Sequence, residues 1–434
     1  MKTAIILSIG DELVLGQTVD TNSAWLSHQL AAVGCAIKAH MTVPDDQQAI
    51  EDAIRESAQR CDFLIVTGGI GPTADDLTRQ ALAGMMNAPL ELDQKWLDHM
   101  TAYFKERGRV MPRTNEIQAM IPRGAELIWN HNGTAAGMRA RISIGEVASA
   151  TVSDAPQCEI FITPGVPKEM KMMFERDVLP RVRERGGSSD SVILSRTLHT
   201  FALGESAIAE MLGDLMRRDR NPSVGTTVAN GIVSLRLNSR FDSRDEAQRQ
   251  LDETDGACRA ALGDLIFGAD DESLQQAVGR LLASSRKKVT TAESCTGGLL
   301  AKMITDVSGS SDYFHTGFVT YSNKAKYERL GVSMEIINVY GAVSEPVVSL
   351  MAKNARRLTK SHFALAISGV AGPTGGSATK PVGTVCIALA FDDEQPPMAR
   401  TFLFPGDREW VRDRAAKMAL TMLRYHLVGK PLPV

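Results

Sequence analysis

The sequence has few of the features that mark a specialised class of protein. Aromatic residues make up 5% of its 434 residues, and the formal net charge is only −3. Because polynucleotide binding usually needs a basic strip interleaved with aromatic side chains, this composition argues against a nucleic-acid partner. A small nucleotide is not excluded, since a few local basic groups can hold a phosphate. The apolar and charged fractions, 44% and 23%, are those of an ordinary globular protein.

Cysteine clusters and long apolar runs are also missing. The six cysteines are widely scattered, with no CxxC pair and no Cys/His cluster at zinc-ligand spacing. The apolar run Thr3–Ile9 is too short to cross a membrane, and Gly10, Asp11 and Glu12 end it before any signal-peptide cleavage site. We therefore expect reduced thiols, no membrane association and a cytoplasmic location.

Three regions follow one another along the chain. Residues 1–171 and 270–434 alternate short apolar runs with stretches of helical spacing, which is typical of crossover units around a mostly parallel sheet. Residues 172–269 have a β-α-β-α order, with strands near 192–200 and 231–237, and no motif for chemistry. The predicted fold class is α/β, with two three-layer α/β domains joined by a small α+β middle domain. A hairpin is expected within 142–162.

A glycine-rich loop stands between a strand and a helix in the first region. Gly68, Gly69 and Gly71 would let backbone amides approach an anion closely, although a tight turn is the simpler explanation. Asp75 and Asp76 follow at once. One of them can cap the next helix, or both can serve as oxygen ligands of a hard metal ion.

A second acidic loop follows the first strand and contains Glu12, Asp20 and Asn22. The carboxyl ends of parallel strands line one edge of a sheet, so this loop and the glycine-rich loop should face the same cleft. Asp20 and Asn22 could equally be helix caps. If the carboxylates do gather, solvent or a cation must relieve their repulsion.

Ser294 lies in a sharp polar turn between a strand and a helix in the third region. A nucleophile in such a turn is exposed above the sheet, and nearby amides can stabilise an oxyanion. Ser294 or Thr296 can instead be a plain helix cap, the commoner use of such residues.

Lys326 falls in the first turn of a later helix, after the natural cap Ser322 or Asn323. The helix dipole disfavours a cation there by about 0.3–1 kcal/mol, which is less than one pKa unit. Only burial could lower the pKa enough for Lys326 to act as a base near neutral pH. An exposed Lys326 would be an ordinary surface residue.

A glycine-dense loop with a following lysine completes the third region. Such a loop suits a phosphate, with a flexible surface loop as the alternative. Its candidate residues are Gly372, Thr374, Gly375, Gly376 and Lys380.

These segments carry a specific resemblance. GDELVLGQTVDTN, TGGIGPTADDLT and PGVPKEM resemble the amino-terminal domain of the CinA family (competence/damage-inducible protein A), which is similar to molybdopterin-binding domains. AESCTGG, YSNKAK and GVAGPTGG followed by KPVGTV resemble the family's carboxy-terminal domain, which is similar to nicotinamide mononucleotide deamidase. Together the matches cover most of the chain.

The resemblance implies a bifunctional hydrolase of pyridine-nucleotide salvage. The carboxy-terminal domain would convert nicotinamide mononucleotide to nicotinate mononucleotide and ammonia without a cofactor, with Ser294 as nucleophile, Lys326 as base and Tyr321 assisting. The amino-terminal domain would hydrolyse ADP-ribose with a divalent metal of unspecified identity. A homodimer is implied too. The remaining implied site residues are Glu293, Cys295, Thr296, Gly297 and the glycine-dense loop for the deamidase substrate; Gly68, Gly69, Gly71 and Asn22 for the other nucleotide; and Glu12, Asp20, Asp75 and Asp76 for the metal.

Three alternatives remain open at this stage. Cys295 is a rival nucleophile, because a thiol at a helix start can have a depressed pKa, but it has no adjacent histidine. The amino-terminal domain could bind a pterin or nucleotide without catalysis. The whole chain could be a non-enzymatic binding protein for DNA uptake, which its acidic balance disfavours.

Overall fold

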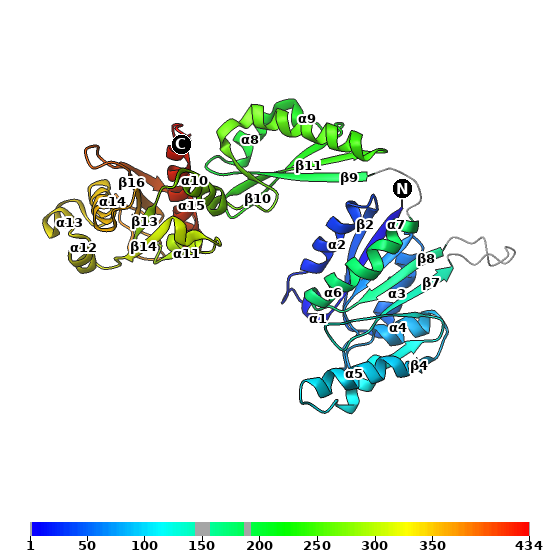
Figure 1. Ribbon diagram of the computed structural model, residues 1–434. Helices are drawn as coiled ribbons and strands as arrows, with labels where there is room; N and C mark the ends of the chain where they lie inside the picture. Colours follow the sequence, from blue (N-terminus) through cyan, green and yellow to red (C-terminus); the bar gives the residue numbers. More distant parts are fainter. Residues whose placement is uncertain (1, 144–156, 186–191, 434) are drawn as a thin grey trace. The chain divides into compact units, whose positions relative to one another are not determined.

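The computed structural model describes residues 2–143, 157–185 and 192–433 (Figure 1). They form two compact units. The first comprises Met1–Leu194 with Ser239–Arg249, and the second comprises Ser195–Asn238 with Gln250–Val434. No helix in the described ranges is both long enough and apolar enough to span a bilayer.

The first unit is built on a six-stranded sheet in the order β2-β1-β3-β8-β7-β6. The first four strands are parallel, and β7 and β6 are antiparallel. Most of the hairpin predicted within 142–162 lies outside the described residues, which omit 144–156; β7, which ends at Ser143, pairs antiparallel with β8. The strands are β1 (Thr3–Ile9), β2 (Ala36–Val43), β3 (Phe63–Thr67), β6 (Glu126–Ile128), β7 (Gly137–Ser143) and β8 (Gln157–Thr163), with β4 (Leu90–Leu92) and β5 (Met120–Pro122) forming a separate pair.

Helices cover both faces of this sheet because its central strands are apolar on both sides. Ile6 and Phe63 pack in one core with Leu26 and Phe174, whereas Leu7 and other residues of the opposite face pack in a second core. The helices are α1 (Asp11–Val14), α2 (Thr21–Ala31), α3 (Gln47–Ala58), α4 (Thr78–Met85), α5 (Gln94–Glu106), the 3₁₀ segment Arg113–Ala119, α6 (Pro167–Met173), the π segment Phe174–Val178 and α7 (Leu179–Arg185).

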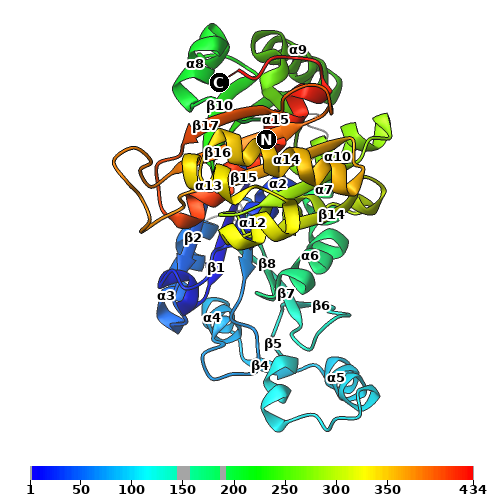
Figure 2. The same cartoon turned by 90° about the vertical axis from the view of Figure 1, so that its left-hand side faces the viewer.

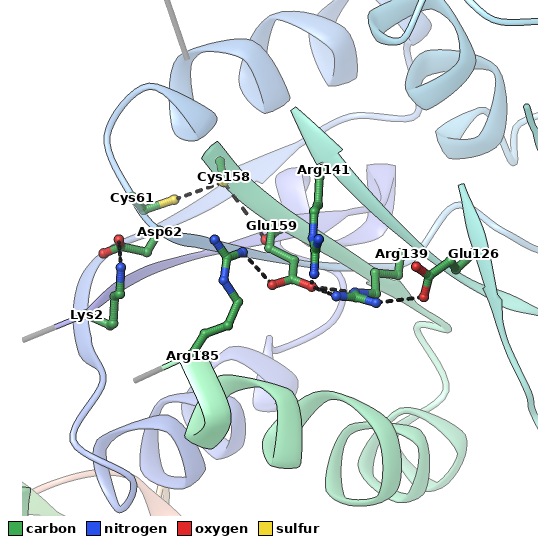
Figure 3. A network of polar contacts seen from close by, with 9 residues as sticks. All are labelled: Lys2, Cys61, Asp62, Glu126, Arg139, Arg141, Cys158, Glu159 and Arg185. Carbon is green, nitrogen blue, oxygen red and sulfur yellow. Dashed lines mark hydrogen bonds and ion pairs between the residues drawn. The ribbon is translucent and has the colours of Figure 1, made fainter. Parts of the chain in front are cut away.

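The predicted end of the first region at residue 171 falls inside α6. The helical segment continues without a break from Pro167 to Arg185, so the structure places the end of this region later than predicted. At its end, Arg185 and Arg139 contact Glu159, a fully buried carboxylate near the start of β8 (Figure 3).

The middle region forms a four-stranded sheet in the order β10-β11-β9-β12. Both predicted strands are present, as β9 and β11, but the sheet has two more strands that were not predicted. β10 was missed because it contains a glycine and only one of its seven residues, Val224, is buried, so hydrophobic alternation is absent, and β12 has only four residues. The elements are β9 (Val192–Thr200), α8 (Glu205–Leu212), the 3₁₀ segment Gly213–Met216, β10 (Ser223–Ala229), β11 (Ile232–Phe241), α9 (Arg244–Leu262), the 3₁₀ segment Gly263–Leu265 and β12 (Ile266–Ala269).

The C-terminal sheet has the order β14-β13-β15-β16-β17, with β14, β13 and β15 parallel and the last two strands antiparallel. Figure 2 shows α12, α13 and α14 in front of its strands; α10, α11 and α15 pack in the core on the other face. This confirms the predicted α/β class. The elements are α10 (Leu274–Ser285), β13 (Val289–Glu293), α11 (Leu299–Thr305), the 3₁₀ segment Ser310–Asp312, β14 (Phe314–Val319), α12 (Asn323–Leu330), α13 (Met334–Tyr340), α14 (Glu345–Thr359), β15 (Phe363–Gly369), β16 (Thr384–Ala390), β17 (Met398–Leu403) and α15 (Arg408–Leu427).

Candidate active sites

The three C-terminal motifs follow the carboxyl ends of three neighbouring parallel strands. The Ser294 turn follows β13, the Tyr321 turn follows β14, and the glycine-dense loop follows β15. Because parallel strands end at one edge of a sheet, segments far apart in sequence meet there.

Glu293 stabilises the turn at Ser294. This fully buried carboxylate accepts hydrogen bonds from the amides of Gly298 (3.0 Å), Leu300 (3.1 Å) and Ala301 (2.8 Å). It thereby satisfies the free N–H groups of the first turn of α11, where a negative charge is favoured. Glu293 therefore serves the backbone of the turn, contrary to its prediction as a substrate ligand.

Lys326 reaches Ser294 inside the protein. Only 1% of the Lys326 surface is exposed, and its Nζ lies 2.9 Å from Ser294 Oγ. The same Nζ donates to the carbonyl oxygens of Thr320 (2.9 Å) and Tyr321 (3.4 Å). Burial lowers the pKa of Lys326 to about 8. The burial that a lysine base requires is therefore present.

Cys295 is buried in the core, although its thiol is close enough to Lys326 for the two charges to interact. Its side chain belongs to the hydrophobic core with residues of α10 and α15, and burial raises the pKa of its thiol to about 12. A thiol that stays protonated in a core is a poor nucleophile. The geometry thus favours Ser294 over Cys295.

The backbone beyond Ser294 offers free donors. Positive φ angles at Gly297 (59°) and Gly298 (95°) let the chain turn sharply before α11. Within the described residues, the amides of Cys295 and Thr296 donate to no backbone acceptor, and the buried Thr296 hydroxyl has no partner. Such amides are the type of donor that stabilises an oxyanion.

The backbone carbonyl of Tyr321 accepts a hydrogen bond from Lys326, whereas its side chain makes a contact elsewhere. The side chain is 59% exposed, and its hydroxyl accepts a 2.8 Å hydrogen bond from Arg408 Nη2. Arg408 Nη1 also donates to Gly372 O at 2.8 Å. The predicted proton-transfer role for the Tyr321 hydroxyl therefore finds no contact with Lys326, whereas Arg408 joins the Tyr321 turn to the glycine-dense loop.

Most of the glycine-dense loop is open to solvent. Thr374, Gly375 and Gly376 are exposed, while Gly372 is buried and bound through its carbonyl. Lys380 donates its Nζ to Tyr340 O at 2.7 Å, which directs the amine towards the end of α13. The loop can contact a ligand, but its lysine is already engaged.

Arg408 and Arg412 were missed by the sequence analysis. Arg412 Nη2 donates to Thr296 O at 2.7 Å, and its Nε is buried without a partner among the described residues. Both residues lie at the start of α15, far along the chain from every motif. Their spacing of four residues on one helix face was the only available signal.

The acidic and glycine-rich loops of the first unit meet at a pocket of about 650 Å³. Glu12, Gly68, Gly69, Gly71, Asp75 and Asp76 line it, as predicted for a shared cleft. Tyr103 and Phe104 of α5 also line the pocket. Asp20 and Asn22 instead line a neighbouring pocket of about 150 Å³, together with Glu12.

Two of the four predicted metal ligands are used within the protein. Asp20 is the N-cap of α2, and although burial opposes it, hydrogen bonds from Ser23 and Ser8 lower its pKa. Asp76 accepts from the amides of Gly71 (2.6 Å) and Thr73 (2.9 Å) and so closes the glycine-rich loop.

No set of three carboxylate, imidazole or thiol groups in the described ranges is arranged to hold a metal ion. The predicted four-carboxylate cage is therefore not assembled. Of the other two, Asp75 is exposed and takes a hydrogen bond from Thr73, which lowers its pKa, and Glu12 lines both pockets. Magnesium often uses one or two carboxylates together with substrate phosphates. These two oxygen donors fit a metal that is shared with a bound diphosphate.

Arg79 lies beneath the glycine-rich loop and was also missed. It is fully buried, it donates to the carbonyls of Ile70 and Gly71, and burial lowers its pKa to about 10. Asp76 accepts from the Gly71 amide. Side chains therefore bond both the N–H and the C=O groups of the loop. Asn22 plays a similar part, since its Nδ2 donates to Gly165 O at 2.8 Å.

The fold and the site define an α/β protein with a buried serine–lysine pair in its C-terminal region. Three family models match the chain: the probable molybdopterin binding domain over residues 5–184, the damage-inducible protein CinA KH domain over 195–268, and the CinA C-terminal domain over 271–427.

Relatives match along almost the whole chain. A competence-damage inducible protein of Symbiobacterium thermophilum is 41% identical over 98% of this chain and 99% of its own. One of Desulforudis audaxviator is 40% identical over 98% of each. The chain therefore belongs to the CinA family of competence-damage inducible proteins, and the resemblance seen in its motifs is confirmed.

Solved structures match parts of the chain. A CinA superfamily protein of Klebsiella pneumoniae is 37% identical and covers 36% of this chain and 96% of its own, with a TM-score of 0.35. A molybdenum cofactor biosynthesis protein of Corynebacterium diphtheriae is 16% identical and covers 42% of this chain and 96% of its own, with a TM-score of 0.28.

Proposed function

We propose that the C-terminal region is an amidohydrolase that converts nicotinamide mononucleotide and water to nicotinate mononucleotide and ammonia. The observation that carries this proposal is the buried contact of 2.9 Å between Lys326 Nζ and Ser294 Oγ. A lysine whose pKa is lowered to about 8 is neutral in a useful fraction of molecules near neutral pH.

The reaction would proceed in two halves. In the neutral form, Lys326 Nζ accepts the Ser294 hydroxyl proton while Oγ attacks the carboxamide carbon. The amides of Cys295 and Thr296 would donate to the oxyanion, and Lys326 passes its proton to the leaving nitrogen, which departs as ammonia. Water then attacks the ester on Ser294, with Lys326 again accepting a proton, and nicotinate mononucleotide is released.

The phosphate end of the substrate has a candidate place at the start of α15. Leu299, Arg408 and Arg412 line a pocket of about 370 Å³ together with the carboxylates Glu409 and Asp413. Arginine pairs suit phosphate oxygens because the guanidinium presents several donors in one plane. The pocket holds as many carboxylates as arginines, so the preference for a phosphorylated amide over a free one is part of the proposal and is tested by comparing the two.

The proposal is tested by ammonia release from nicotinamide mononucleotide by the purified full-length chain. We expect one ammonia for each nicotinate mononucleotide formed, and weaker activity on the unphosphorylated nucleoside. No ammonia under metal-free and metal-supplemented conditions would exclude the deamidase.

The pH dependence of the deamidase follows from the lysine. Below a pH of about 8 the Lys326 amine is mostly protonated and cannot accept the serine proton. We therefore expect kcat/KM to rise about tenfold per pH unit below that value and to level off above it. A profile that is flat between pH 6 and 9 would contradict the role of Lys326 as base.

For the first unit we propose hydrolysis of ADP-ribose to AMP and ribose 5-phosphate. The supporting observation is the 650 Å³ pocket, which combines a glycine-rich loop with the aromatic residues Tyr103 and Phe104. The volume suits a dinucleotide-sized ligand, with the base against the aromatic side chains and the diphosphate at the loop.

The charge of the pocket supports a dependence of this proposed reaction on a divalent cation. In the described structure the pocket lining contains five carboxylates and no Lys, Arg or His; these are Glu12, Asp45, Asp75, Asp76 and Glu169. Burial and the nearby Asp11, Glu12 and Asp75 raise the pKa of Asp45, so the carboxylates already repel one another. A metal bound to the diphosphate would neutralise it, with Glu12 and Asp75 as its protein ligands.

We expect ADP-ribose hydrolysis to stop when divalent metal is chelated and to return when metal is restored. Asp75→Asn should raise the metal concentration needed for half-maximal rate about 10- to 100-fold. Asp52→Asn, on the outer face of α3, is the matched control and should change nothing. Binding of ADP-ribose or a pterin without turnover would instead leave this unit as a binding domain.

Two expectations of the sequence analysis remain proposals as well. A homodimer and a cytoplasmic location follow from family resemblance and from the scattered cysteines. Light scattering of the purified chain tests the first, and fractionation of cells tests the second.

A further inference from the structure

Side chains at the start of α15 form hydrogen bonds with the turns of the proposed deamidase site. Arg408 bonds the Tyr321 hydroxyl and Gly372 O, and Arg412 bonds Thr296 O, all at 2.7–2.8 Å. The positions of these segments therefore depend on the position of α15 along and around its own axis.

A buried lysine of α15 hydrogen-bonds the helix to the middle region. Lys417 pairs with Asp413 one turn earlier at 2.7 Å and donates to Asn230 O at 2.9 Å. Asn230 and Gly231 form the turn between β10 and β11, with φ angles of 49° and 75°. The lysine side chain is 9% exposed, so this charge-assisted bond is made away from bulk water.

Two further contacts secure α15 to the middle region. The Arg414 guanidinium lies over the ring of Phe201, which follows β9, at 6.0 Å from its centroid. At the far end of the helix, Arg424 donates to Asp264 O (2.6 Å) and Ile266 O (2.7 Å), next to β12.

Most of the rest of the buried surface of α15 is apolar, including Val411, Ala415 and Leu420. Apolar packing is non-directional and does not by itself fix how far a helix slides or turns. Hydrogen bonds from buried cations to particular carbonyls do fix it, because their strength falls steeply with distance and angle.

We infer that the four-stranded middle sheet is a positioning element of the Ser294–Lys326 site. Its β10–β11 turn, held by Lys417, sets the register of α15 and thereby places Arg408 and Arg412 against the catalytic turns. Lys417 is a positioning residue that touches neither the substrate nor the reacting atoms. This inference rests on the proposed deamidase.

The test uses Lys417→Met in the full-length chain, which keeps an unbranched side chain one atom shorter than lysine and removes its charge. We expect kcat/KM for nicotinamide mononucleotide to fall about 10- to 100-fold, since misplacement near 1 Å has effects of that size. The loss should lie mainly in KM if the arginines bind phosphate. Hydrolysis of ADP-ribose should not change.

A second variant keeps the inference testable if Lys417→Met does not fold. Gly231→Val places a branched side chain at a positive φ, 3.4 Å from Arg414, and should have the same kinetic effect. Asn230→Gly is its matched control, because it preserves the carbonyl and tolerates the turn, and it should keep wild-type kinetics.

Labelling of Ser294 by a phosphonofluoridate, followed by peptide mass spectrometry, separates this inference from the proposed substrate. It reports the reactivity of the serine whether or not nicotinamide mononucleotide is hydrolysed. We expect slower labelling in Lys417→Met and Gly231→Val than in wild type and Asn230→Gly. Wild-type labelling and kinetics in either folded variant would overturn the inference.

Discussion

Replacing Ser294 with alanine or Lys326 with methionine should each reduce kcat/KM for nicotinamide mononucleotide by about 10,000-fold or more. Ser294 supplies the nucleophile and Lys326 the base, and one is inactive without the other. The double variant should therefore be no worse than either single variant, because residues that act as a unit are not additive. Ammonia release measured over several enzyme concentrations checks this.

Matched controls exist for both positions. Lys324→Met removes a lysine two residues away on the same helix, with 81% of its side chain exposed, and should leave the rate unchanged. Cys295→Ala removes the rival nucleophile from the core and should cost stability but retain activity. Full activity in Ser294→Ala, or loss only in Cys295→Ala, would contradict the assignment.

Glu159→Gln should destabilise the first unit by about 3–5 kcal/mol, the usual cost of removing one partner from a buried ion pair. Figure 3 shows why: Arg185 Nη1 lies 2.6 Å from this fully buried carboxylate, Arg139 contacts it directly, and Arg141 lies 3.8 Å away. Without its charge, three guanidinium groups would face one another. Because three of the four tryptophans, Trp25, Trp96 and Trp129, lie in this unit, tryptophan fluorescence in urea mainly follows its unfolding.

Glu126→Gln is the matched control for that variant. Glu126 pairs with the same Arg139 at 2.7 Å, but its side chain is 62% exposed, so the loss should be at most about 1 kcal/mol. Equal losses in the two variants would show that burial of Glu159 does not matter.

We also expect the first unit to lose stability in acid because of the Glu159 carboxylate. Burial tends to raise the pKa of Glu159, but the hydrogen bonds from Arg185 and Arg139 outweigh it and lower the pKa. A carboxyl with a depressed folded-state pKa stabilises the fold above its unfolded pKa of about 4.3, and that stability is lost as pH falls through the folded-state value. Glu159→Gln should remove this part of the acid sensitivity.

The sequence was sufficient to place the candidate residues at strand ends. Apolar runs that end in glycine-rich turns predict a parallel sheet and its binding edge, and the structure brings the loops of Glu12 and Gly68, and those of Ser294 and Lys326, together at such edges. The requirement that Lys326 be buried also followed from the size of the helix-dipole effect.

Local patterns could not decide what each carboxylate binds. Glu293, Asp20 and Asp76 stand beside turns where a ligand or a backbone amide could take the same oxygen, and in all three cases amides take it. The choice depends on the path of the backbone in three dimensions.

Distant partners could not be predicted for a different reason. Arg408 and Arg412 reach the site only because α15 packs against the sheet, and their spacing of four residues along the chain does not by itself mark a site. The same holds for the Thr320 and Tyr321 carbonyls that hold Lys326, since any residue can supply a carbonyl.

The most direct test is peptide mass spectrometry of the enzyme quenched during turnover of nicotinamide mononucleotide. We predict a nicotinate mononucleotide ester on Ser294 that accumulates in wild type, is absent in Ser294→Ala, and disappears when substrate is exhausted. An adduct on Cys295, or steady ammonia release with no dependence on Ser294, would contradict the serine–lysine mechanism.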